Sequence, residues 1–97
     1  MNRTEWIAAT AAQTGLTKKQ TEKILLTALR IIGDTLAEGE SVRLTGFGQF
    51  ETRYRAARVC RGFQKDAPAQ RVAAAVLPVF RAGTQLRERV NQEKEQT

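Results

Sequence analysis

The stretch from Gly46 to Phe63 constrains the fold most, because it cannot supply a hydrophobic core. It reads GFGQFETRYRAARVCRGF, two glycines around an aromatic residue and then arginines alternating with apolar or small residues. Between Thr52 and Lys65 the chain has no acid and five cations: Arg53, Arg55, Arg58, Arg61 and Lys65. A segment of this composition is predicted to project from the folded body.

Strand geometry orders this stretch into two faces. Alternate residues of a strand share a face, so Arg53 and Arg55 are predicted to point one way, and Phe50, Thr52 and Tyr54 the other. A ribbon with one cationic face suits the phosphates of a polynucleotide. Phosphate contacts supply affinity without sequence information, so we expect salt-dependent and weakly selective binding.

The positive charge is concentrated in the middle of the chain. Residues 51–81 hold seven Lys/Arg against two Asp/Glu, whereas residues 1–50 hold six against five and residues 82–97 three against three. The net charge of +6 therefore comes almost wholly from the middle third. A concentrated excess of this kind indicates a polyanionic partner.

Two capping signals precede helical patterns near the N-terminus. Asn2 with Glu5 has the spacing of an N-cap and its capping-box partner, and Gly15 should end the first helix. Thr17 with Gln20 repeats the signature before a second helix.

The second helix, predicted over residues 18–38 with Gly39 as its stop, has apolar residues on more than one face. They are Ile24, Leu25, Leu26, Ala28, Leu29, Ile31, Ile32 and Leu36. The first helix can cover only one of those faces, so we infer a dimer in which the second helices pack across the interface. Segment 55–73 has few large apolar residues and adds little to a core, so fewer than about eighty residues remain for the folded body. A single core of that size is marginal, which independently favours a dimer.

The remainder predicts a small antiparallel sheet and a last helix. A strand over 41–45 leads through a turn at Gly46 to a strand starting at 47, with Gly48 marking a close backbone approach. A reversal is expected within 62–68, and a returning strand over 71–80 in which Pro78 requires an edge or strand-end position. A helix over 82–92 and a frayed tail over 93–97 follow.

In this order of elements the chain resembles the HU/integration host factor family of bacterial architectural proteins. The resemblance covers about residues 1–91 and rests on the following blocks: Met1-Asn2-Arg3-Thr4-Glu5, Gly46-Phe47-Gly48-Gln49-Phe50, Arg55-Ala56-Ala57-Arg58, Arg61, Ala73-Ala74-Ala75 and Pro78-Val79-Phe80-Arg81-Ala82-Gly83. It implies an intertwined dimer whose two β-ribbon arms lie in the DNA minor groove, with an apolar wedge at each tip that kinks the duplex.

The chain departs from the family pattern at the tip of the arm. The family has Arg-Asn-Pro with the proline as wedge, whereas this chain has Arg61-Gly62-Phe63. Phe63 falls on the wedge position, and phenylalanine is an intercalating side chain. Packing of Phe63 against its own arm or the partner's is the alternative.

These observations predict one α+β domain, residues 1–97. It comprises a helical dimerisation part (1–39), a three-stranded antiparallel sheet with a DNA-binding arm at about 55–73 (40–81), a short C-terminal helix (82–92) and a tail (93–97). The predicted DNA-binding residues are Arg53, Arg55, Arg58, Arg61, Phe63, Lys65, Arg71 and Arg81.

The predicted function is architectural: binding double-stranded DNA with little sequence specificity and bending it. The partner subunit is an identical chain or a paralogue, and the protein is expected in the cytoplasm at the nucleoid, without membrane or small-molecule partners. The chain has no histidine and no metal-ligand spacing, so no enzyme activity, cofactor or metal is expected. The competing hypotheses are a sequence-preferring factor like integration host factor, an RNA binder, and a dimeric scaffold protein with altered arm tips.

Overall fold

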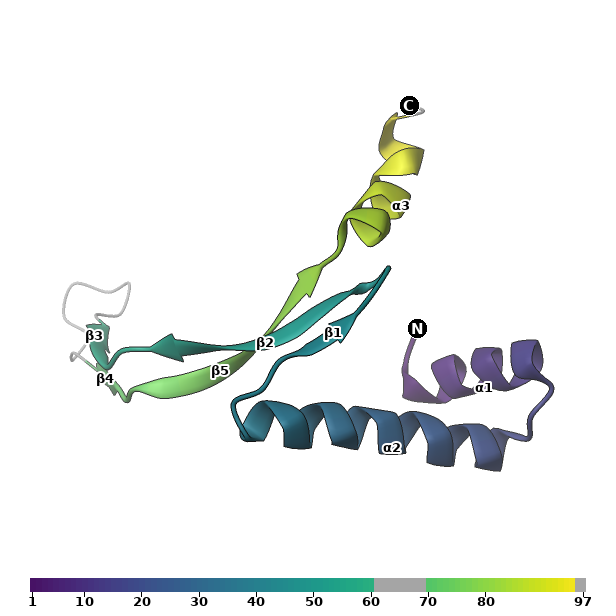
Figure 1. Cartoon of the computed structure of the whole chain (residues 1–97), viewed down its shortest axis with the longest axis horizontal. Helices are drawn as coiled ribbons and strands as arrows, with labels where there is room; N and C mark the ends of the chain where they lie inside the picture. The colour runs from purple at the N-terminus through teal and green to yellow at the C-terminus, as the bar shows by residue number, and fades with distance from the viewer. Residues whose placement is uncertain (61–69, 96–97) are drawn as a thin grey trace.

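The computed structural model describes residues 1–60 and 70–95, and Figure 1 shows two helices, a sheet that extends into a long ribbon, and a third helix that stands apart. The helices are α1 (Arg3–Thr14), α2 (Lys18–Ala37) and α3 (Thr84–Glu95). The strands are β1 (Val42–Leu44), β2 (Gly48–Arg55), β3 (Arg58–Cys60), β4 (Gln70–Val72) and β5 (Ala75–Ala82). The α+β class predicted from the sequence is confirmed.

The predicted caps define the first two helices. The Glu5 amide donates to Asn2 Oδ1 at 2.8 Å, and Gly15 ends α1 with a left-handed φ of 75°. At α2 the capping box is complete, because the Gln20 amide donates to Thr17 Oγ1 at 3.1 Å and the Thr17 amide to Gln20 Oε1 at 3.2 Å. These bonds satisfy amides that a helix start leaves without intrahelical partners.

The strands form two antiparallel ladders. One is a three-stranded sheet in the order β1-β2-β5, and the other pairs β3 with β4. Pro78 lies on β5, opposite Thr52 of β2. In the described sheet β5 pairs only with β2, so the predicted edge position of Pro78 is confirmed. An edge strand accommodates proline because one of its sides needs no ladder donor.

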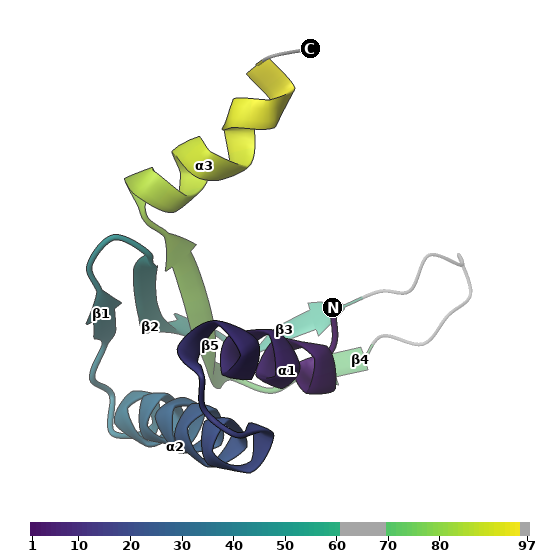
Figure 2. The same cartoon turned by 90° about the vertical axis from the view of Figure 1, so that its right-hand side faces the viewer.

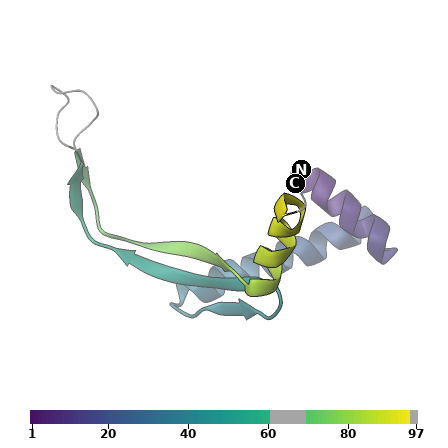
Figure 3. The ribbon, with the colours of Figure 1, turned by 90° about the horizontal axis from the view of Figure 1, so that it is seen from above.

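The ribbon bends where the two ladders meet. The β2–β5 pairing, here called the inner ladder, ends at Arg55 opposite Ala75. The β3–β4 pairing, the outer ladder, begins at Arg58 opposite Val72. Two residues on each strand lie between these pairs, so the register is kept and no bulge is inserted. Seen from above, the ribbon leaves the helices and turns at this break (Figure 3).

The glycines near the sheet have the two roles predicted for them. Gly46 turns the chain with φ 88°, and the Phe47 amide donates to the Leu44 carbonyl at 2.9 Å. Gly48 is buried against β5, where a Cβ would lie 2.6 Å from the Arg81 carbonyl oxygen. Only a residue without a side chain fits that approach.

Very little of the described chain is buried within one copy. Among the described side chains only those of Ile7, Ala11 and Thr21 are buried, and α3 stands away from the other helices (Figure 2). The radius of gyration is 19.0 Å, whereas a compact chain of this length has about 12.5 Å. The single chain is therefore an extended body with most of its apolar surface uncovered.

The third helix begins later and ends later than predicted. Ala82 pairs with Gly48 in the β ladder, and the Gly83 amide donates to the Phe47 carbonyl at 2.8 Å, so α3 starts at Thr84 instead of residue 82. It continues to Glu95, into the segment predicted to fray.

Candidate nucleic-acid interface

The inner ladder gathers arginines on one face. Arg53 and Arg55 alternate along β2, and Arg81 on β5 lies opposite Gln49, a residue of the same β2 face. Arg53 and Arg81 are exposed, which leaves their guanidinium groups accessible to a ligand. The face that the sequence predicted to be cationic is therefore present, with Phe50, Thr52 and Tyr54 on the other side.

One arginine of this face was not predicted from the sequence. Arg43 on β1 lies opposite Gln49, which in turn lies opposite Arg81, so the three residues form a row across the sheet. Arg43 and Arg81 line the same shallow, open hollow beside the turn at Gly46. The sequence feature that could have indicated it is the alternation Val42-Arg43-Leu44, because it places Arg43 on the strand face opposite its two apolar neighbours.

The outer ladder presents an arginine on each face. Arg58 lies opposite Val72, and Arg71 lies opposite Val59. Because successive residues of a strand point to opposite faces, Arg58 and Arg71 stand on different sides of the ribbon. Both are exposed. A ribbon with cations on both faces can meet the phosphates on both sides of a groove.

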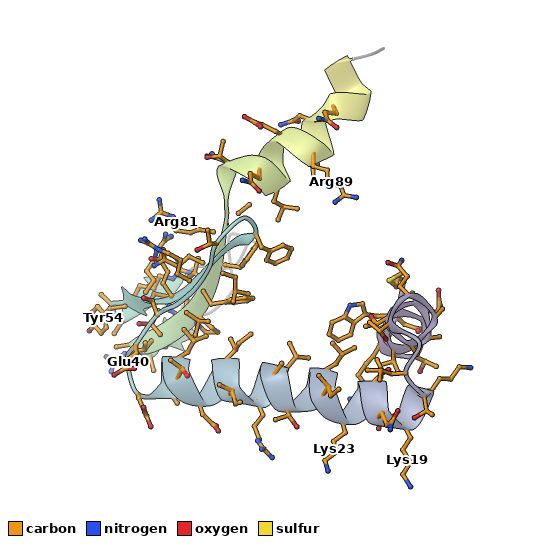
Figure 4. The ribbon with its side chains drawn as sticks, turned by 45° about the vertical axis from the view of Figure 1, so that its right-hand side comes forward. Lys19, Lys23, Glu40, Tyr54, Arg81 and Arg89 are labelled. Carbon is orange, nitrogen blue, oxygen red and sulfur yellow. The ribbon has the colours of Figure 1, made fainter. Side chains whose placement is uncertain are left out.

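Arg81 also has a contact within the protein. Its Nη1 lies 3.6 Å from Glu51 Oε1, and the side chains are 69% and 25% exposed respectively. An ion pair at this exposure contributes about 0–1 kcal/mol. Arg81 is therefore held in place weakly and keeps donors for another anion, and Figure 4 shows it on the sheet side remote from Lys19 and Lys23.

Arg55 differs from the other arginines of the arm. Its side chain is half-buried, and its Nη2 donates to the Ala73 carbonyl on the returning strand at 3.2 Å. Its Nε is buried with no hydrogen-bond partner in the described residues. This guanidinium lies against the ribbon and is directed at the protein's own backbone.

An aromatic cluster anchors the base of the ribbon. The Phe80 ring lies 4.9 Å from that of Phe50 and 5.4 Å from that of Phe47, both in tilted arrangements. Such pairs contribute about 0.5–1.5 kcal/mol each beyond the area they bury. The cluster packs β2, β5 and the turn after β1 against one another. The strands that carry the cationic face are therefore fixed relative to one another at the base of the ribbon.

Three predicted site residues, Arg61, Phe63 and Lys65, lie outside the described residues. Lys19 and Lys23 project from the side of α2 that faces away from the sheet (Figure 4), as expected of solvated lysines. Residues 1–60 and 70–95 contain no cluster of three metal-ligating side chains. In the same residues no helix is both long and apolar enough to cross a bilayer.

Known protein families include one whose members match this chain over most of its length. A family model described as bacterial DNA-binding protein matches residues 1–91. The chain belongs to the bacterial DNA-binding protein family. The likeness to HU proteins noted in the sequence is thereby confirmed.

Individual members of the family are similar over nearly their whole length. The chain is 47% identical to the DNA-binding protein HU of Lactococcus lactis over 89 residues, which cover 92% of this chain and 97% of that protein. A cocrystal structure of Anabaena HU with DNA matches with a TM-score of 0.86 and 38% identity, covering 95% of this chain and 99% of the other. HU of Thermotoga maritima matches with a TM-score of 0.67 and 33% identity, covering 93% and 98%.

Proposed function

We propose that the protein is an architectural DNA-binding protein that acts as a homodimer, contacts duplex DNA with little sequence specificity and bends it. The observation that carries the proposal is the arginine-bearing ribbon that leaves the body of a bacterial DNA-binding family member. The Anabaena HU structure that this chain resembles contains DNA. By this role the protein is associated with the nucleoid, and it has no catalytic function.

The dimer follows from the surface that one copy leaves uncovered. Ile24 and Ile31 on α2 are each 56% exposed, and Phe47 at the base of the ribbon is 46% exposed. Large apolar side chains exposed to this degree on a helix and at the base of the ribbon are typical of an interface. A second copy of the chain would cover these residues, and the two ribbons of the dimer would then act together on one duplex.

The proposed contacts divide by their place on the ribbon. Arg43, Arg53 and Arg81 contact phosphates at the base of the arm, while Arg58 and Arg71 contact phosphates on both sides of the minor groove farther out. Arg61 and Lys65 extend the cationic arm beyond the described residues, and Phe63 supplies the wedge. Electrostatic contacts bring the arm onto the duplex, and partial unstacking by the wedge permits a bend that increases the contact surface.

Fluorescence anisotropy with three unrelated duplexes of about 35 base pairs, titrated across a salt series, tests the function. Similar affinities with a log–log salt slope on the order of −3 or steeper are expected, because each neutralised phosphate contributes about −0.9. One strongly favoured duplex would instead indicate a sequence-preferring factor. Absence of binding at low salt would refute the DNA-binding role and redirect attention to acidic protein partners.

A further inference from the structure

A groove lies where the C-terminal end of α2 meets the sheet. It has a volume of about 520 Å³ and is lined by Gly33, Leu36 and Ala37 of α2 and by Thr52, Val76 and Pro78 of β2 and β5. Thr52 belongs to the face of β2 opposite that of Arg53, so the groove lies on the side of the sheet away from the arginines. Volumes of about 300–1,000 Å³ are typical of ligand-binding sites.

Small residues form the helical side of this groove. Gly33 lies inside α2, where glycine is less stable than alanine. No neighbouring side chain lies within 4 Å of a Cβ added at Gly33, so nothing within one copy requires glycine there. Ala37 follows one helical turn later, and the two residues together leave the α2 backbone open to a close approach.

The groove is separate from the apolar surface assigned to the partner copy. Successive residues of an α-helix are rotated by about 100°, so Gly33 is about 200° from Ile31, an exposed isoleucine of that surface. Ala37 is likewise about 140° from Ile24. The side of α2 that lines the groove therefore differs from the side assigned to the dimer.

The groove ends at acids that have no cation beside them. Asp34, Glu38 and Glu40 are exposed, Glu38 also lines the groove, and the last turn of α2 has no basic residue. Figure 4 shows Glu40 near Tyr54, where α2 meets the ribbon. None of these acids forms an ion pair within the described residues, and none belongs there to a cluster that could hold a metal ion. Because the C-terminus of a helix is itself negative, this end of α2 attracts an external cation.

We propose that the groove binds a basic peptide segment of another protein, with an aliphatic side chain over Gly33 and Ala37 and a lysine or arginine side chain at the acidic end. The arginine face repels such a segment, so the acids direct it to the groove. Since the groove and the arginine face lie on opposite sides of the sheet, binding of peptide and of DNA do not exclude each other. The inference goes beyond the proposed DNA-binding role and does not depend on it.

A titration of the isotope-labelled full-length protein, followed by its amide NMR shifts, tests the proposal. The probe is a peptide in which two leucines lie between pairs of lysines, and its matched control has glycines in place of the leucines. The leucine peptide should shift the amides of Gly33, Gly39 and Thr52. It should bind at least about tenfold more tightly than the glycine peptide, because leucine side chains bury apolar surface. Equal affinities for the two peptides, or shifts only elsewhere, would overturn the groove as the site.

Substitutions separate the apolar contact from the acidic one. G33L fills the groove with a good helix former and should weaken binding of the leucine peptide at least about tenfold, with DNA affinity unchanged because no arginine is altered. E38Q should weaken it about twofold to threefold, whereas the matched variant E22Q removes an acid of α2 remote from the groove and should leave it nearly unchanged.

Two results with these variants would contradict the proposal. Wild-type peptide affinity in G33L would remove the groove from the binding site, and equal affinities of E38Q and E22Q would remove the acidic contact. Sedimentation velocity identifies a different occupant. A sedimentation coefficient of the wild type that rises with protein concentration, and that G33L keeps constant, would show that a second copy of the chain occupies the groove instead of a peptide.

Discussion

Replacing Gly48 by alanine is expected to destabilise the base of the arm, because this glycine is the closest backbone approach in the sheet. The added Cβ would lie 2.6 Å from the Arg81 carbonyl oxygen and 2.6 Å and 2.7 Å from two atoms of the Phe80 ring. The ring could rotate away only by leaving its contacts with Phe47 and Phe50. The carbonyl could move only by opening the pairing of Gly48 with Ala82.

The size of the effect follows from two opposing contributions. Overpacking a filled site costs about 1–3 kcal/mol, and contact with a backbone atom places G48A near the upper end. Alanine in a strand regains about 0.5–1 kcal/mol relative to glycine. The free energy of unfolding should therefore fall by about 2 kcal/mol per copy, or about 4 kcal/mol for the dimer. For a dimer that unfolds as one unit of roughly 190 residues, this lowers the Tm by about 8–16 °C.

Thermal unfolding followed by circular dichroism, at matched protein concentrations, measures the change. G33A is the matched control, because Gly33 lies inside α2 with no atom within 4 Å of an added Cβ. This control should gain up to about 1 kcal/mol from helix propensity. A Tm for G48A within about 1 °C of the wild type, with G33A raised, would refute the close approach.

Four further predictions concern other parts of the molecule. T17A removes the acceptor of the α2 capping box and should lower the free energy of unfolding by about 1 kcal/mol in urea titrations, since one capping amide loses its partner. E51Q removes an acid from the cationic face and should tighten DNA binding about fivefold at low salt, measured by anisotropy, because a carboxylate near phosphates costs about 1 kcal/mol. I31E should shift sedimentation velocity profiles toward the monomer, because a charge would be buried at the interface, while the control K23E stays dimeric. F63A should lose most of the DNA bend in a two-dye energy-transfer assay, and unchanged bending would exclude the wedge role.

Local signals in the sequence predicted the local structure well. The caps at Asn2 and Thr17 and the helix end at Gly15 rest on bonds between residues at most four apart, so spacing alone reveals them. The two faces of β2 likewise follow from simple alternation. Such features need no knowledge of what the chain packs against.

Features that depend on distant pairing were predicted poorly or not at all. The start of α3 was placed two residues early because Ala82 favours a helix by itself, while its pairing with Gly48 keeps it in the sheet. Arg43 was left out of the site because only the register across β1, β2 and β5 aligns it with Arg81. In the same way, nothing near Arg55 in the sequence indicates an acceptor at Ala73.

The structure separates the residues that hold the body together from those that direct the arm. One copy buries little beyond Ile7 and Ala11, so the stability of the body depends on the apolar surface that the partner copy would cover. The outer ladder, by contrast, is joined to the sheet through the break between the Arg55–Ala75 and Arg58–Val72 pairs. Substitutions in α2 should therefore change assembly and unfolding together, whereas substitutions of the exposed arm arginines Arg53, Arg58 and Arg71 should change DNA binding at nearly constant stability. A protein built this way can vary how it shapes DNA by changing a few residues of the arm, without altering the fold that carries it.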